Sequence, residues 1–222
     1  MTNLTRRHFM IGSGLLFSAP ISTPAVAQPI SDRDMWSVWD AQVTPAGYDP
    51  ATSNPWGFHE RFLPRRVLAN DGLVPGDIHV DAVARYLYHV EENGTAMRYG
   101  VAIARGDLYE HGTYTIRRKA RWPVWRPTNN MIEREPETYE QFADGMDGGP
   151  QNPLGARALY LYVGDRDTYL RIHGTPSPRS IGGRASSGCV RMVMAHIIDL
   201  YDNVSTGATA YLYPPEDVIA ET

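Results

Sequence analysis

The alternation of polar and apolar positions predicts a series of β-strands from about residue 77 onward. Two of the apolar runs flank Asn93-Gly94, a pair that predicts a hairpin whose two turn residues both have positive φ. Because no helical pattern separates these runs, antiparallel or mixed pairing is expected. The strands expected here are at 77–81, 86–90, 96–103 and 114–116.

The last third of the chain predicts a second pair of strands, then a helix and a final strand. Glycine and aspartate at 164–167 indicate a tight connection within the pair. Apolar residues at helical spacing over 197–204 predict a helix, with Gly207 as its C-cap. The strands expected in this part are at 158–163, 168–173 and 208–213.

One of these runs also predicts which side chains share a face of the sheet. Side chains of a strand alternate between its two faces. Leu170 and Ile172 are therefore expected in the core, with Tyr169, Arg171 and His173 on the other face. His173 is expected at the end of the strand, directed away from the core.

The N-terminal part of the chain has a different pattern. Thr5 to Met10 fits a twin-arginine motif, and a short apolar run and Ala25-Val26-Ala27 follow, as in an export signal. The apolar run is too short for a membrane span, which needs about 20 residues. We expect a signal peptide at 1–27, an N-terminal arm at 28–75 with a short helix near 31–38, a catalytic domain at 76–214 and a tail at 215–222.

Composition narrows the class of protein. The chain has 222 residues, of which 42% are hydrophobic and 21% charged, and a formal net charge of −4. A negative net charge argues against nucleic acid as a partner, although Trp122 to Pro127 interleaves tryptophans with a basic residue. Two prolines there favour a rigid surface loop instead. Residues 133–142 have moderate helix propensity.

Cys189 is the only cysteine of the chain, which excludes an internal disulfide and a cysteine-cluster metal site. An odd cysteine in an exported protein indicates an intermolecular disulfide or a thiol kept for chemistry. With the helix expected after it, Cys189 is predicted to lie just before a helix, where the dipole favours a thiolate. His173 lies upstream and would take the thiol proton. The alternative is a structural cysteine with an unrelated histidine.

The residues before Cys189 are small. Ser186, Ser187 and Gly188 form a loop whose N–H groups are candidates for binding an oxyanion. Gly188 would also let a substrate approach the backbone closely.

These motifs together resemble a known family. His173-Gly174-Thr175 followed by the run from Ser186 to Met192 is similar to the active-site signature of the L,D-transpeptidases (YkuD domain). The segments from Asn152 to Tyr160, from Trp122 to Thr128 and from Asp199 to Tyr201 resemble its periplasmic branch. The resemblance covers roughly residues 77–213.

The resemblance implies a compact, mostly β domain with a few short helices (α+β) and a mixed sheet. It also implies a reaction in which Cys189 attacks the L-centre carbonyl of residue 3 of a peptidoglycan tetrapeptide stem and D-alanine leaves. His173 would move the proton, and Gly188 and Cys189 would supply oxyanion N–H groups. Gly174 would lie on the substrate side, and Arg191 would either contact the substrate or position the loop.

The resemblance also implies the partners. These are peptidoglycan stem peptides and an amine acceptor, such as a second stem or a wall protein, in the periplasm. No cofactor or metal is expected. Hydrolysis, as in an L,D-carboxypeptidase, and a non-catalytic wall-binding module are the alternatives.

Two positions raise questions of their own. Many family members have histidine where this chain has Ser187, which affects the hydrogen bonding of the loop. Arg191 and Arg179 have a competing explanation as ion-pair partners of Asp165 or Asp167.

Overall fold

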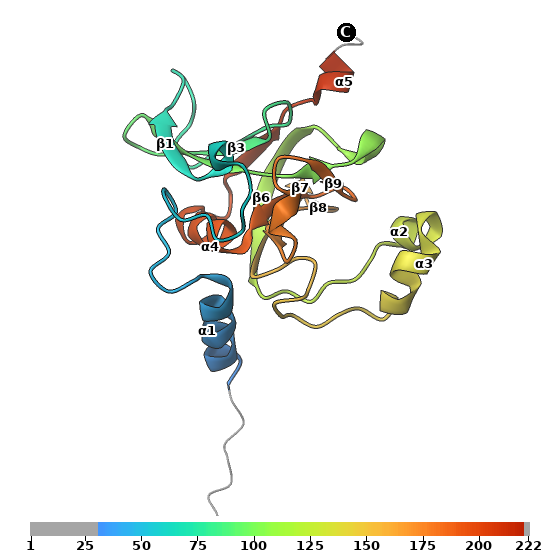
Figure 1. Ribbon diagram of the computed structural model, residues 1–222. Helices are drawn as coiled ribbons and strands as arrows, with labels where there is room; N and C mark the ends of the chain where they lie inside the picture. Colours follow the sequence, from blue (N-terminus) through green and yellow to red (C-terminus); the bar gives the residue numbers. More distant parts are fainter. Residues whose placement is uncertain (1–30, 220–222) are drawn as a thin grey trace, which may run out of the picture. The chain divides into compact units, whose positions relative to one another are not determined.

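The computed structural model describes residues 31–219, and strands dominate this part of the chain. The predicted signal peptide, 1–27, lies outside the described residues. The described part forms one mixed sheet in the order β1-β4-β3-β2-β11-β6-β7-β8-β10 and a small sheet of β5 and β9 (Figure 1). The prediction of a mostly β fold with short helices is confirmed. The strands are β1 (Arg65–Leu68), β2 (Ile78–Asp81), β3 (Tyr86–Val90), β4 (Thr95–Gly100), β5 (Ile103–Ala104), β6 (Gly112–Arg121), β7 (Arg157–Val163), β8 (Arg166–Thr175), β9 (Arg184–Ser186), β10 (Val190–Val193) and β11 (Thr209–Leu212).

The helices are short. In residues 31–219 none has the length and hydropathy needed to cross a membrane. The helix predicted at 133–142 begins earlier and is broken, because Pro136 disfavours helical backbone at Glu135, which has φ −141° and ψ 64°. The α-helices are α1 (Asp32–Val43), α2 (Asn129–Arg134), α3 (Pro136–Tyr139), α4 (Met194–Asn203) and α5 (Glu216–Ile219). Single 3-10 turns are η1 (Glu60–Phe62), η2 (Gly106–Leu108), η3 (Glu140–Phe142) and η4 (Pro178–Ser180).

The predicted hairpin is present, as β3 and β4 pair in antiparallel fashion. Its turn differs from the prediction, because Gly94 has φ +77° but Asn93 is not among the residues with positive φ. The Glu91 N–H donates to the Thr95 carbonyl at 2.8 Å, so three residues form the loop. A three-residue hairpin loop needs the left-handed conformation only at its last position.

The second predicted pair, β7 and β8, is also present and antiparallel. Val163 pairs with Arg166, so the connection is a two-residue turn, shorter than predicted. The sheet is mixed because β10 runs parallel to β8, and β11 runs parallel to β2 and antiparallel to β6.

Helix α4 covers the end of the sheet that includes β8. It packs against β7, β8 and β10, and its Ile197 and Leu200 are fully buried in the main core. Burying each such side chain contributes about 1.5–3 kcal/mol. The helix ends at its C-cap Val204, not at the predicted Gly207. The Lys119 ammonium donates to the carbonyl of Val204 at 2.6 Å and so caps this end.

The described part of the predicted arm is anchored to the sheet. Arg157, only 2% exposed, forms a two-point ion pair with Asp40 of α1 at 2.8 and 2.7 Å. The Trp122 indole N–H also donates to Asp40, at 3.1 Å, and its ring packs edge-on against Trp39. Trp122 is therefore buried, which corrects the prediction that the whole segment beginning there is a surface loop.

Candidate active site

The four polar residues of the candidate site share one face at the edge of the sheet. Val190 of β10 is buried in the main core, so its neighbours Cys189 and Arg191 have their side chains on the opposite face. In the parallel pairing of β10 with β8, Val190 aligns with Ile172 and Arg191 with His173. The fourth residue is Arg171, which precedes Ile172. The predicted division of β8 between core and polar face is thus confirmed.

Cys189 does not lie just before a helix. Strand β10 follows it directly, and α4 begins only at Met194. The helical spacing of apolar residues over 197–204 gives no sign of the four-residue strand that lies between Cys189 and the helix. The dipole of α4 therefore cannot be the reason for a reactive thiol, and the neighbours on β8 take that place.

His173 is held in one tautomer within β8. The strand continues to Thr175 and His173 is only 4% exposed, which corrects the expectation of an exposed strand end. Its Nδ1 donates to the Gly174 carbonyl at 2.6 Å, which leaves Nε2 without a proton. Burial first, and then the charges of Arg191 and Arg171, lower the pKa of His173 to about 3. The ring is neutral at pH 7.

The loop after Asn152 supports this histidine. The Pro153 carbonyl of this loop favours the protonated ring and so opposes, in small part, the lowering of the His173 pKa. Asn152 is 1% exposed and holds the loop, because its side chain accepts from the Leu154 N–H at 2.8 Å and donates to two carbonyls. Gly155 completes the contact with β8: a Cβ there would lie 2.8 Å from the carbonyl carbon of Gly174.

Cys189 is half-buried against β8. Its Sγ lies 3.7 Å from the Tyr169 carbonyl oxygen, in donor geometry. Burial raises the pKa of the thiol, opposed by a hydrogen bond from the Arg171 backbone and by the charges of Arg171 and Arg191. The thiol is therefore protonated at pH 7, on the face of the sheet that also carries the neutral imidazole of His173.

The sequence did not predict that the backbone of Tyr169 would contact the thiol of Cys189. It is 69% exposed and has φ +62°, which is uncommon outside glycine. The Asp167 carboxylate accepts from the Tyr169 N–H at 2.8 Å and stabilises this turn within β8. An Asx turn inside a strand has a weak signal, because strand alternation dominates the same residues.

The loop before Cys189 is organised by Ser186. This serine is 2% exposed, donates to the Cys189 carbonyl and accepts from the Gly188 N–H at 3.4 Å. Its hydroxyl is therefore engaged in holding the loop. A Cβ at Gly188 would lie 3.6 Å from Leu170 and 4.0 Å from Leu108, in ordinary van der Waals contact, so no atom crowds this backbone.

Ser187 connects the loop to α3. Its hydroxyl shares a hydrogen bond of 2.9 Å with the Tyr139 hydroxyl and accepts from Arg105 at 3.4 Å. Arg105 in turn forms an ion pair with Glu135. The sequence indicated neither Tyr139 nor Arg105, because both are distant along the chain and belong to no motif.

Arg191 has no acidic partner in residues 31–219, and no hydrogen bond from its guanidinium is found there. The competing ion pairs are absent in that range, because Arg117 pairs with Asp165 and Arg171 with Asp167. A half-buried guanidinium without an acceptor is suited to bind an anionic group of a ligand.

Gly174 is the last of the predicted site residues. Gly174 is buried, and a Cβ there would lie 3.1 Å from both Ile197 and Met194. Its contribution is the carbonyl that orients His173, not the substrate surface that was predicted. In the described residues no group of three histidine, cysteine or acidic side chains is placed to hold a metal ion.

Comparison with models of protein families identifies the domain. A model of the L,D-transpeptidase catalytic domain (YkuD) matches residues 75–212, more than half of the chain. The chain belongs to the YkuD family. Cys189, His173 and Arg191 all lie within the matched residues.

The chain matches about half of each of two curated relatives from Escherichia coli. Probable L,D-transpeptidase YbiS of Escherichia coli (strain K12) is 29% identical over 162 residues, which cover 72% of this chain and 51% of YbiS. Probable L,D-transpeptidase ErfK/SrfK of the same strain is 28% identical over 147 residues, 65% of this chain and 46% of that protein. The chain thus spans about half the length of the curated relatives it matches.

The similarity to solved structures is limited, with TM-scores below 0.5 for the two described here. A crystal structure from Brucella melitensis, described as a probable carnitine operon oxidoreductase, is 50% identical, covers 65% of this chain and 89% of its own, and has a TM-score of 0.48. An L,D-transpeptidase from Mycobacterium smegmatis is 17% identical, covers 62% and 58%, and has a TM-score of 0.47. Membership of the YkuD family therefore rests on the match to the family model.

Proposed function

We propose that the protein is a peptidoglycan L,D-transpeptidase with Cys189 as its nucleophile. The observation that carries this proposal is the placement of the only cysteine beside β8. There a neutral His173, with its Nδ1 engaged by Gly174, shares the face of the sheet with it. Membership of the YkuD family supports the same reaction class.

In the acylation step the Cys189 sulfur attacks the carbonyl carbon of residue 3 of a tetrapeptide stem. The thiol proton passes to Nε2 of His173, and a C–S bond forms as the tetrahedral intermediate develops. The C–N bond to D-alanine then breaks, and His173 returns the proton to the leaving amine. The Gly174 carbonyl accepts from Nδ1 throughout and keeps the ring oriented.

In the second step an amine acceptor attacks the thioester. His173 takes a proton from the amine as the new C–N bond forms; the C–S bond then breaks, and His173 gives that proton to the departing sulfur, which restores the Cys189 thiol. A side-chain amine of a second stem or of a wall protein is the acceptor. Water in the same place would give hydrolysis.

The oxyanion of each intermediate needs donors near Cys189. The N–H groups of Gly188 and Cys189 are the candidates, and at Gly188 the oxyanion would replace the long hydrogen bond of 3.4 Å to the Ser186 hydroxyl. Ser186 still holds the loop through the Cys189 carbonyl. Ser187 of this loop is hydrogen-bonded to Tyr139, so we assign Ser187 to positioning the loop.

Arg191 would bind a carboxylate of the stem peptide. It stands next to His173 in the sheet and lacks an acidic partner in the described part of the chain. The substrate reaches the protein outside the cytoplasm in this proposal, because the N-terminal sequence has the features of an export signal.

The test is analysis of muropeptides incubated with wild type, Cys189→Ala and His173→Ala. We expect wild type to release D-alanine and form a dimer or exchanged stem, and Cys189→Ala to form neither. A carbapenem should add its mass to wild type and not to Cys189→Ala.

Each alternative has a distinct result. Tripeptide without dimer would identify an L,D-carboxypeptidase. Binding of muropeptides without D-alanine release by wild type, and without a carbapenem adduct, would identify a wall-binding module and overturn the proposal.

A further inference from the structure

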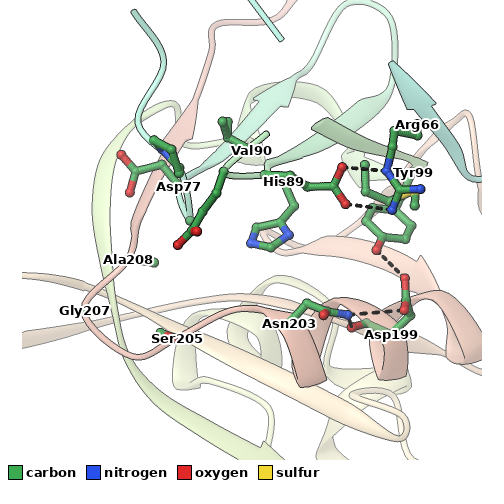
Figure 2. Close-up of a pocket in the computed structure, with 15 residues that line it drawn as sticks. Arg66, Asp77, His89, Val90, Tyr99, Asp199, Asn203, Ser205, Gly207 and Ala208 are labelled. Carbon is green, nitrogen blue, oxygen red and sulfur yellow. Dashed lines mark hydrogen bonds and ion pairs between the residues drawn. The ribbon is translucent and has the colours of Figure 1, made fainter. Parts of the chain in front are cut away.

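A cavity of about 600 Å³ lies on another part of the sheet, between β2–β4 and the C-terminal end of α4. Figure 2 shows its lining, with Tyr99 and Asp199 on one side and Asp77 and Ala208 on the other. Neither Cys189 nor any other residue of the candidate active site lines it. Its volume lies within the range of cavities that hold small molecules.

The lining is acidic and only partly neutralised. Arg66 is its one lysine or arginine, and that charge is taken by a two-point ion pair with Glu91 at 2.7 and 2.9 Å. Asp77, Glu92 and Asp199 have no ion-pair partner among residues 31–219.

Asp77 makes this imbalance costly. It is only 7% exposed, and one of its oxygens accepts from the Thr209 N–H at 2.8 Å. A backbone donor satisfies that oxygen without neutralising the charge. A buried carboxylate without a counter-charge is unfavourable, so a cation in the cavity would stabilise the folded chain.

His89 gives an independent sign of a missing ligand. The side chain is 7% exposed, and its Nε2 is buried without a hydrogen-bond partner in the described structure. Figure 2 shows the ring projecting into the cavity between the Asp77 side and the Asp199 side. Buried polar atoms are nearly always paired, so an orphaned nitrogen directed into a cavity marks a contact for a ligand.

These observations decide the chemistry of the ligand. No group of three ligating side chains in residues 31–219 is placed for a metal ion, whereas the carboxylates are spread around the cavity. Ammonium groups carry several N–H donors and match dispersed acceptors. We propose that the cavity binds a small molecule with primary ammonium groups, of the size of a diamine or a dibasic amino acid. The ammonium groups pair with Asp77, Glu92 and Asp199, and one N–H donates to Nε2 of His89.

Calorimetric titration of the protein with 1,5-diaminopentane tests this proposal, with 1,5-pentanediol as the uncharged control of the same length. We expect the diamine to bind at least about tenfold more tightly than the diol at low salt, because the diamine forms charge pairs with the carboxylates and the diol forms none. The measurement is repeated in Cys189→Ala, so its outcome does not depend on the proposed reaction.

Three variants locate the binding. Asp77→Asn retains an acceptor for Thr209 and is expected to weaken diamine binding roughly fivefold. Glu92→Gln, at an exposed position where folding is not at risk, is expected to have a similar effect. Glu133→Gln removes an exposed carboxylate that does not line the cavity and is expected to change nothing.

The ring of His89 supplies a direct signal. Addition of diaminopentane should shift the ¹⁵N resonance of its Nε2. The proposal is overturned if the diol binds as tightly as the diamine, or if saturating diamine gives no binding. It is equally overturned if Glu133→Gln weakens binding as much as Glu92→Gln, or if only resonances near Cys189 move.

Discussion

Two of the buried histidines, His173 and His89, stand in strands of one sheet but in opposite electrostatic surroundings. Burial lowers the pKa of both. Beside His173 the nearest charges are Arg191 and Arg171, which lower its pKa further. Beside His89 they are carboxylates, which oppose the effect of burial. Neighbouring charge, and not burial, separates the two sites.

Hydrogen bonding separates them as well. Nδ1 of His173 is paired with the Gly174 carbonyl, so the other nitrogen is fixed as a proton acceptor on the face of the sheet that carries the thiol. Nε2 of His89 has no partner in the described structure and faces a cavity. The first arrangement suits a general base, and the second suits a contact for a cationic ligand.

Removing the ring of His173 should have the largest effect. His173→Gln is expected to slow acylation of Cys189 by a carbapenem by about a hundredfold to ten-thousandfold, the range for loss of a general base. Intact-protein mass spectrometry over time measures this rate. His111→Gln, at an exposed position, is the control and should acylate at the wild-type rate. A loss of less than tenfold at His173 would contradict its role as base.

The contact between Gly155 and Gly174, whose carbonyl orients His173, leaves no room for a larger residue at position 155. Gly155 has φ +62°, and a Cβ there would lie 2.6 Å from Met194 Sδ and 2.8 Å from Gly174 C. Gly155→Ala is expected to lower the free energy of unfolding by about 2–4 kcal/mol, from overpacking and left-handed backbone together.

The matched control for this change is Gly94→Ala. Gly94 has φ +77° with nothing within 4 Å of a Cβ, so only the backbone cost of about 1–2 kcal/mol applies. Urea denaturation measures both variants. Equal losses would show that the contact between the 152–155 loop and β8 contributes nothing.

Arg191 tests whether the cationic surroundings serve the substrate. Arg191→Gln is expected to lower kcat/KM for muropeptide about tenfold to a hundredfold, mainly through KM, because a charge-assisted hydrogen bond contributes about 1.5–3 kcal/mol. Arg117→Gln is the control, since Arg117 already pairs with Asp165 away from the thiol. An unchanged KM in Arg191→Gln would remove it from the substrate contacts.

The sequence predicted the strands of this fold well, because their side chains alternate over one buried face. The β3–β4 and β7–β8 pairs and the last strand follow from that pattern. The helix after Cys189 was placed too close to it, because β10 is a short buried strand whose apolar residues merge with those of α4. Periodicity does not separate two apolar elements that join without a turn.

Of the candidate site, the sequence predicted only the residues that belong to the motif. Cys189, His173 and Arg191 stand close together in the sequence pattern and in the sheet. Tyr169, Asn152 and the acidic cavity depend on backbone turns and on contacts between distant segments. Local alternation carries no information about such contacts.

The pH dependence of the thiol sharpens the contrast between the two histidines. The raised pKa of Cys189 means that the thiol keeps its proton at neutral pH, so its thiolate fraction rises tenfold with each pH unit below that pKa. The pKa of His173, about 3, leaves the ring neutral above about pH 4, so it adds no step. Alkylation by iodoacetamide should therefore rise about tenfold per unit from about pH 6 to about pH 8 without a plateau. Because Cys189 is the only cysteine, the mass of the intact protein reports this rate directly. A plateau at neutral pH would indicate a thiolate–imidazolium pair, and the neutral state described for this site would then be wrong.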